Sequence, residues 1–387
     1  MFRRLSLLVG RATDHDYAAS VTIGVGALGG LAWSSFSTSS YQRAMAAWPM
    51  SRGVLGIASW RDFVGTGLMT LFFFAVGLEL ARERHHGSLR NLRHSLAPVL
   101  GAFTGMAGPA LIVVAAGLIT RTPTLVHGWG IPMATDIAFT LAVLAVAGSR
   151  VPASLRTFLL TLAITDDVAS IVVLAATGAT RVNFGWLALS GALVGAIITI
   201  SRWHHSTPWR LCVVALVWWA LARAGVEPPL AGVIAGVIVP FDAHRSLRLE
   251  RAMTRLSVAV VLPLFALAYC GVSWSNLASA TPLTIIVAVI LARLLGKAVG
   301  ISVGVATARR LGARLAPGIS GISLTAAGVL CAIGVTVPLL FAGRLYDPQS
   351  ATYGAFDVGL VVASILAALV GVVLLRTATR HQPEGDS

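Results

Sequence analysis

Residues 158–176 read FLLTLAITDDVASIVVLAA, an apolar run that contains two adjacent aspartates. A transmembrane helix needs about 20 consecutive, mostly apolar residues, and this run has that length. A charged residue near the centre of a bilayer costs roughly 2.5–3.5 kcal/mol on insertion scales, so Asp166 and Asp167 need compensation. The run therefore predicts a transmembrane helix whose two buried carboxylates serve a function.

The composition of the whole chain agrees with a membrane protein of many spans. Of the 387 residues, 56% are hydrophobic and 11% are charged, whereas soluble proteins carry roughly 25% charged residues. No connection is long enough for a soluble domain, so residues 1–387 are predicted to form one integral, all-α, polytopic membrane domain. About twelve candidate spans lie near residues 17–36, 63–80, 96–119, 131–148, 155–177, 184–200, 209–222, 228–240, 257–272, 281–305, 319–341 and 356–375.

The loops between these spans indicate the topology. Of the 29 lysines and arginines, 20 fall in the terminal segments and alternate loops, 7 in the other loops and 2 within a span. Cytoplasmic loops carry the excess of basic residues, so both termini are predicted to be cytoplasmic. The net charge of +14 comes from these loops, so we expect contact with membrane lipid and no binding of nucleic acid.

Two further charged residues lie inside predicted spans. Asp136 lies in the segment GIPMATDIAFTLAVLAV, and Lys297 lies in VAVILARLLGKAVGISVGV. Asp166 and Lys297 could form a purely structural salt bridge, and Asp136 could merely compensate a helix end. One lysine cannot fully neutralise both Asp166 and Asp167, however, and paired carboxylates form a hard, anionic site that suits a small cation. Competition between a cation and protons for this pair would suffice for exchange.

Two of the spans have the composition of interrupted helices. Pro132 precedes Asp136 in one of them, and the segment GISLTAAGVLCAIGVTVPLLFAG carries glycines and a proline along its length. Interrupted spans in corresponding positions of two halves indicate a transporter site, so residues 96–177 and 281–375 are candidate inverted three-helix repeats. Asp136 would suit the positive N-termini of half-helices, and Lys297 their negative C-termini. Glycine and proline also occur in ordinary, tightly packed spans.

A charged cluster ends the second span, in the segment GLELARERHHGSLRNLR. Glu79 and Glu83 have helical i,i+4 spacing, and Arg82 lies between them. Histidines beside them titrate near neutrality, so the cluster could sense cytoplasmic pH. The alternative is a solvated, charged helix end.

These residues resemble the NhaA family of bacterial sodium/proton antiporters. The resemblance covers residues 68–371 and is weaker at the N-terminus. The segments that carry it are FFFAVGLELARER, GWGIPMATDIAFTLAVLAVAGSRVP, LAITDDVASIVVLA, PLAGVIAGVIVP, VVLPLFALAYCGVS and GKAVGIS.

The resemblance implies roles for the intramembrane residues. Asp166 and Asp167 match the paired aspartates at which sodium and protons bind alternately. Lys297 matches the lysine that pairs with the first aspartate, and Thr135 and Asp136 match the residues where the discontinuous helices cross. No resident cofactor is expected, because the ions are the substrates.

The resemblance also implies a regulated, dimeric transporter that is not an enzyme. Glu79, Arg82, Glu83 and Glu250 match a cytoplasmic network linked to pH activation. The family fold has twelve helices, inverted repeats and two discontinuous helices that cross in mid-membrane. Family members exchange cytoplasmic sodium or lithium for external protons electrogenically, by alternating access, in the bacterial inner membrane and usually as homodimers.

The chain departs from the family pattern at three places. Gly65 and Thr66 replace an Asn-Asp pair, Glu227 replaces a histidine linked to pH, and residues 332–336 read AIGVT instead of GIGFT. The paired aspartates and the lysine are intact, so the departures concern the pH set-point.

Two rival functions use intramembrane carboxylates. An ion-coupled symporter of the bile-acid class would need a polar pocket for an organic substrate, and the spans show no surplus of mid-span polar residues beside the aspartates. An intramembrane aspartyl protease needs two facing aspartates that share a proton, which a nearby Lys297 would disturb.

Overall fold

The computed structural model describes residues 21–47, 57–86, 92–136, 140, 143, 153–177, 183–200, 207–226, 228–238, 243–271, 280–313, 315, 319–348 and 350–380. All regular structure in these ranges is helical, and they contain no strand. The chain divides into two compact units, which consist of residues 1–24, 88–170 and 272–387, and of residues 25–87 and 171–271.

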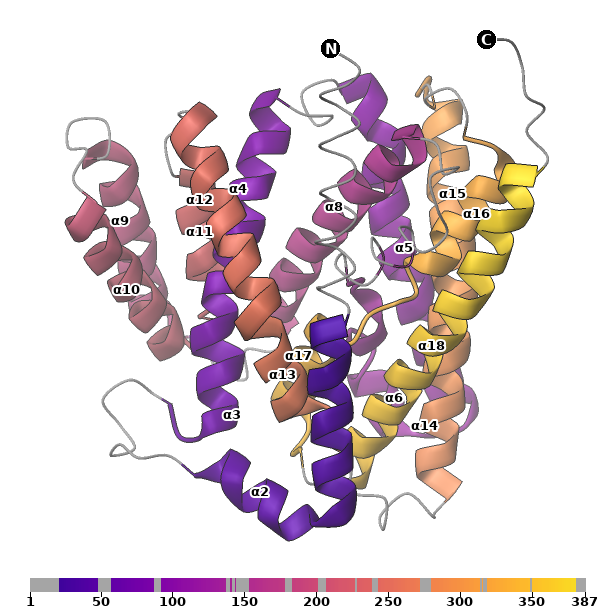
Figure 1. Ribbon diagram of the computed structural model, residues 1–387, viewed down its shortest axis with the longest axis horizontal. Helices are drawn as coiled ribbons and strands as arrows, with labels where there is room; N and C mark the ends of the chain where they lie inside the picture. Colours follow the sequence, from indigo (N-terminus) through magenta and orange to yellow (C-terminus); the bar gives the residue numbers. More distant parts are fainter. Residues whose placement is uncertain are drawn as a thin grey trace. The chain divides into compact units, whose positions relative to one another are not determined.

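Unit 1 contains both candidate repeats as far as Ser170, and it holds the intramembrane charges. Helix α8 crosses the boundary between the units. The elements of this unit are α5 (Leu92–Ile119), α6 (Pro123–His127), η3 (Ile131–Met133), α8 (Ala153–Thr177), α14 (Ala280–Leu291), η6 (Ala292–Gly296), α15 (Lys297–Arg310), α16 (Gly321–Leu330), α17 (Thr336–Leu345) and α18 (Ala351–Arg380) (Figure 1).

Unit 2 contains the charged end of the second predicted span. Within it, α4 packs along α11, and α9 lies beside α10. Besides the helix Val21–Phe36, most of which lies in this unit, its elements are α2 (Thr38–Ala46), α3 (Trp60–Asp62), η1 (Phe63–Leu68), α4 (Met69–His86), α9 (Phe184–Ile200), α10 (Thr207–Ala224), α11 (Leu230–Ile238), α12 (Ala243–Leu256), η4 (Ser257–Val261) and α13 (Leu262–Tyr269).

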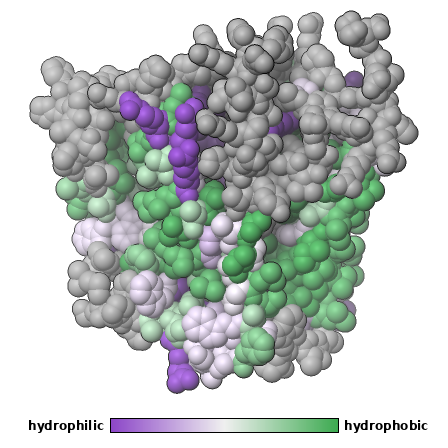
Figure 2. Space-filling model, viewed as in Figure 1, coloured by the Kyte–Doolittle hydropathy of each residue, from purple (hydrophilic) through white to green (hydrophobic). Residues whose placement is uncertain are grey.

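The helices confirm an all-α, polytopic membrane protein. Six helices in the described ranges are long and apolar enough to cross a membrane, and five shorter apolar helices accompany them. Ile365, Leu369 and Val373 of α18 are each more than half exposed, and Figure 2 shows a broad apolar surface where α18 lies. Such a surface is suited to lipid. The count of twelve spans stays a prediction, because most of the predicted span 131–148 lies outside the described residues.

Several predicted spans differ from continuous α-helices, and two of these lie in the second candidate repeat. Residues 319–341 form two helices, α16 and α17, separated by the irregular segment 331–335. Residues 281–305 contain the π-helical turn η6 immediately before Lys297. Such turns are frequent at functional sites, because they change the direction of the side chains that follow.

A seam of glycines joins α5 to α15. A Cβ atom added at Gly108 would lie 2.2 Å from the carbonyl oxygen of Gly296, and one added at Gly300 would lie 2.3 Å from that of Thr104. Only residues without side chains allow helix backbones to approach so closely, as at small-residue interfaces in membranes. The seam therefore fixes the position of α15 against α5.

The seam makes a prediction about stability. Gly300→Ala should cost about 1–3 kcal/mol, because the methyl group must displace a backbone carbonyl rather than a flexible side chain. The midpoint of thermal unfolding of the purified protein should fall. Gly195→Ala in α9 is the matched control, since no atom lies within 4 Å of its added Cβ. Equal midpoints for the two variants would contradict the close packing.

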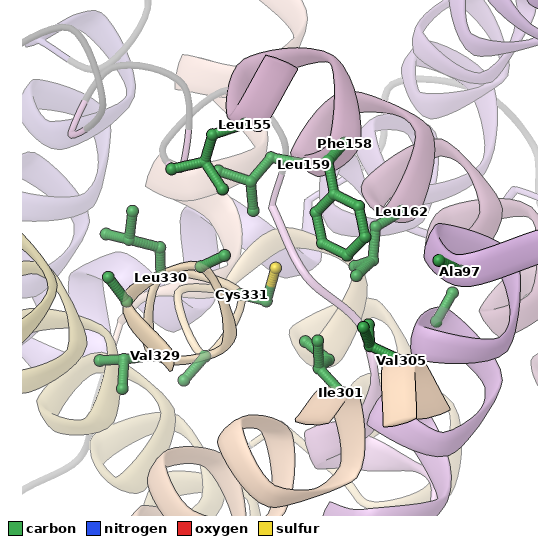
Figure 3. Packing of buried hydrophobic residues seen from close by; sticks show 14 of the residues in the cluster. Ala97, Leu155, Phe158, Leu159, Leu162, Ile301, Val305, Val329, Leu330 and Cys331 are labelled. Carbon is green, nitrogen blue, oxygen red and sulfur yellow. The ribbon is translucent and has the colours of Figure 1, made fainter. Parts of the chain in front are cut away.

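The apolar core of unit 1 orients α8. Leu155, Leu159 and Leu162 lie on one stripe of this helix and point toward α15 and the end of α16, where Leu330 and Cys331 are buried (Figure 3). Asp166 follows Leu162 by four residues and continues the stripe. Packing of the leucines therefore turns the Asp166 side chain into the interior of the unit.

Candidate ion-binding site

The centre of the site is a buried ion pair between α8 and α15. The Lys297 Nζ atom lies 2.9 Å from each of the two carboxylate oxygens of Asp166. Both side chains have an exposed fraction of 0%. A buried ammonium that faces both oxygens of one carboxylate satisfies the charge of that carboxylate, so this pair is locally neutral.

Asp167, the residue after Asp166 on α8, contributes a second buried carboxylate. Its residue is only 2% exposed, and the Ser170 Oγ atom donates to its backbone carbonyl at 2.9 Å. Both hydrogen bonds of Lys297 go to Asp166. Asp166, Asp167 and Lys297 together therefore carry one net negative charge when all three are ionised.

Asp136 lies where two irregular segments of the chain meet. Its carboxylate accepts hydrogen bonds from the backbone N–H groups of Val335, at 2.5 Å, and of Thr336, at 3.0 Å, and from the Thr336 hydroxyl. Its own N–H group donates to the Ile333 carbonyl at 2.9 Å. These contacts cap the N-terminus of α17, where a negative charge offsets the partial positive charge of the helix.

Thr135 adds a second contact between the same segments. Its hydroxyl donates to the Cys331 carbonyl at 2.7 Å, and the Thr140 hydroxyl donates to the Leu330 carbonyl at 3.3 Å. Residues 134–136 and 331–336 therefore meet backbone to backbone. The helix breaks that the sequence predicts near Asp136 and in 319–341 are brought together in one place.

Arg293 is a second buried cation in the apolar run that contains Lys297, and the sequence argument gave it no role. It is fully buried, and its guanidinium donates to the carbonyls of Ala332, Pro132 and Ala134. We expected Lys297 to meet these negative helix ends. Arg293 meets them instead, and Lys297 is engaged with Asp166.

Comparison with known proteins places this arrangement in a family. A sequence model of the family described as Na+/H+ antiporter 1 matches residues 11–375. The chain belongs to the Na+/H+ antiporter 1 family. Its relatives are named as antiporters, which are transporters and not enzymes.

Curated relatives of this antiporter family cover most of the chain. The Na(+)/H(+) antiporter NhaA 1 of Erythrobacter litoralis is 36% identical over 83% of this chain and 81% of its own. The Na(+)/H(+) antiporter NhaA of Tolumonas auensis is 37% identical over 82% of this chain and 81% of its own. The homologue of the same name from an Acidovorax species is 33% identical over 95% of this chain and 92% of its own.

Two further polar residues of this antiporter escaped the sequence argument. The Ser364 hydroxyl accepts a hydrogen bond from the Gly334 N–H group at 3.1 Å and donates to the Leu360 carbonyl at 2.7 Å. Asp357 on α18 is fully buried. An acidic residue within the apolar run 351–375 is a signal that could have found Asp357, whereas a serine in a membrane helix is too common to be one.

The predicted pH cluster of the antiporter lies in unit 2. Arg82 on α4 donates from Nε to a carboxylate oxygen of Glu250 on α12 at 3.1 Å, and its Nη2 atom lies 3.5 Å from Glu79. These side chains are partly buried. Glu83 lies on α4, but its side chain, like Glu227, is outside the described residues.

The acidic residues in the described ranges do not form a resident metal centre. No group of three or more His, Cys, Asp or Glu side chains gathers there. Two carboxylates beside an ammonium are suited to a cation that binds and leaves again, since few charges hold it.

Proposed function

We propose that this chain is an electrogenic sodium/proton antiporter, with lithium as a second substrate, that exports cytoplasmic sodium in exchange for external protons. The observation that carries the proposal is the buried arrangement of Asp166, Asp167 and Lys297 in unit 1. A site with one net negative charge becomes neutral when it binds a sodium ion. Membership of the antiporter family supports the choice of ions.

Charge balance at this site gives a mechanism. When Asp166 and Asp167 are ionised, the site binds one sodium ion and is neutral. When protons replace sodium, both carboxylates become neutral. The ammonium of Lys297 then gives the site one net positive charge. Each cycle then moves one net charge inward, and each charge contributes about 2.3 kcal/mol per 100 mV of membrane potential.

Alternating access would expose the site to one side of the membrane at a time. The meeting point of residues 134–136 with residues 331–336 is the part of unit 1 that we assign to this movement, because irregular backbone there lacks the continuous hydrogen bonds of a helix. Residues 96–177 and 281–375 would be the two repeats. We further propose that the protein lies in the bacterial inner membrane, that both of its termini are cytoplasmic and that it forms a homodimer.

The test is sodium-induced proton movement in everted membrane vesicles that contain the protein. Addition of sodium or lithium should reverse the quenching of a pH-sensitive dye from neutral to alkaline pH, while potassium should not. A faster response when a membrane potential is imposed would support electrogenic exchange. A protein that is inserted and folded, but shows no response to sodium or lithium, would contradict the proposal and favour organic-substrate symport.

We also propose that the cluster of Glu79, Arg82, Glu83 and Glu250 sets the pH response. Protonation of Glu250 removes the ion pair with Arg82, so the contact between α4 and α12 weakens as pH falls. Glu250→Gln imitates the protonated state, so the pH of half-maximal exchange should move to higher pH. The maximal rate at alkaline pH should stay within about twofold, since an ion pair that is open to solvent in part contributes little to stability.

The dye assay checks this prediction as a pH series. Arg248→Gln, on the same helix α12, is the control for a change of charge without loss of the Arg82–Glu250 contact. An unchanged midpoint for Glu250→Gln would show that the cluster is a solvated helix end.

A further inference from the structure

Arg293 makes three hydrogen bonds from three different nitrogen atoms of its guanidinium. Its Nε atom lies 2.7 Å from the Ala332 carbonyl oxygen, Nη1 lies 3.2 Å from that of Pro132, and Nη2 lies 3.0 Å from that of Ala134. A guanidinium is a rigid, planar fork of donors, whereas a lysine ammonium is a single point. The three acceptors surround the fork on different sides.

The carbonyls belong to the ends of two interrupted helices. Pro132 and Ala134 lie in and just after η3, and Ala332 follows the end of α16. The last carbonyls of a helix have no partner within it and carry partial negative charge. Arg293 therefore satisfies carbonyl groups of both breaks at once, and the dipoles of these carbonyls offset its buried charge.

The surrounding residues fit the guanidinium closely. A Cβ atom added at Gly334 would lie 2.3 Å from the Arg293 Nη2 atom and 2.7 Å from the Ala134 carbonyl oxygen. Ser364 on α18 accepts a hydrogen bond from the Gly334 N–H group. The irregular segment 331–335 is therefore held from several sides, with Arg293 as the contact that also reaches residues 132–134.

Arg293 is also linked to the ion-binding residues through its own helix. It lies in η6, four residues before Lys297, and both side chains are fully buried. Asp136 lies two residues after Ala134 and caps α17 from the other side of the break. A shift of the Arg293 contacts would therefore move Asp136 and the start of α17 relative to Lys297.

We propose that Arg293 is a positioning residue for ion exchange, which clamps the breaks of the two interrupted helices together so that they move as one body. The transport part of this inference rests on the proposed function, whereas the clamp itself does not. Because Arg293 serves the negative helix ends, Lys297 is available to Asp166.

The clamp is tested with a cysteine that the chain already has. Cys331 is buried next to Ala332 in unit 1, and Cys270 is buried in unit 2. Two backgrounds would each retain one of them, with the other two of the three cysteines changed to serine. Arg293→Met should raise the labelling rate of Cys331 by a membrane-permeant maleimide at least about tenfold, as expected when hydrogen bonds to a charged group no longer oppose local opening. Labelling of Cys270 should be unchanged.

Exchange and a conservative variant complete the test. All measurements use the monodisperse fraction after size-exclusion chromatography, so that misfolded protein does not affect the measured labelling rate or turnover. Sodium-dependent turnover per folded molecule should fall at least about tenfold in Arg293→Met. Arg293→Lys keeps the charge but not the fork, and should give intermediate values for labelling and turnover. Arg309→Lys, at an exposed position of α15, is the control.

Each outcome has a meaning. Faster labelling confined to Cys331, with reduced turnover, supports the clamp. Wild-type labelling of Cys331 in Arg293→Met overturns it, whatever happens to turnover. Full recovery by Arg293→Lys also overturns it, because a charge alone would then suffice. If the wild-type protein exchanges no sodium, the labelling result still decides whether the clamp exists.

Discussion

Asp167→Asn is expected to abolish sodium-dependent proton movement while the protein remains folded in the membrane. The amide has the shape of the carboxylate but neither its charge nor its ability to take up a proton at neutral pH. Asp166 is already balanced by Lys297 in the variant. A sodium ion would therefore leave one uncompensated positive charge inside the membrane.

The size of this effect follows from the cost of that charge. A buried charge costs roughly 2.5–3.5 kcal/mol on insertion scales, and about 1.4 kcal/mol corresponds to a tenfold change in affinity. Sodium affinity should thus fall by about two orders of magnitude. The measurement is the dye response in everted vesicles over a range of sodium concentrations.

The matched control for this prediction is Asp347→Asn, which makes the same chemical change at an exposed position between α17 and α18. It should respond to sodium as the wild type does. Sodium-dependent proton movement that survives in Asp167→Asn with little change in affinity would show that the second carboxylate does not hold the cation.

Lys297→Met is expected to destabilise the protein by about 3–5 kcal/mol, because it leaves the fully buried Asp166 carboxylate without the ammonium that faces both of its oxygens. Methionine keeps the length and apolar stem of lysine, so the loss is one of charge rather than of packing. The midpoint of thermal unfolding of the purified protein should fall well below that of the wild type.

The double variant Lys297→Met, Asp166→Asn should recover most of this stability, because both buried charges are then absent. It should not recover sodium exchange. A midpoint as low as that of Lys297→Met alone would mean that the loss comes from packing or from another partner of Lys297. Recovery of exchange together with stability would show that the pair is structural only.

The sequence was sufficient to predict the helical membrane fold, because long apolar runs are visible in it directly, and the charges within those runs identify the candidate site residues. Asp166, Asp167 and Lys297 interrupt such runs, and the structure brings Asp166 and Lys297 into contact. The interruption of 319–341 follows from its glycines and proline. Whether the chain has twelve spans, inverted repeats and a dimer interface stays a prediction.

The roles of Arg293 and Lys297 could not be separated from the sequence. Both are cations in the same apolar run, four residues apart, and either could face a carboxylate or a helix end. Arg293 lies within the π turn η6, which ends immediately before Lys297, and no residue pattern in the sequence predicts such a turn. Ser364 was missed because its hydrogen bond to the Leu360 carbonyl is what any serine in a helix could make.

The glycine seam between α5 and α15 has a consequence for how this protein can evolve. Positions 296, 300 and 304 face backbone atoms of α5 at distances that no side chain can occupy, so a saturation library should tolerate almost no substitution there. Val299 and Val303 lie on the same helix and are more than half exposed. These two positions should accept any apolar residue. Along α15, positions that tolerate only glycine should therefore alternate, with the period of the helix, with positions that tolerate many apolar residues.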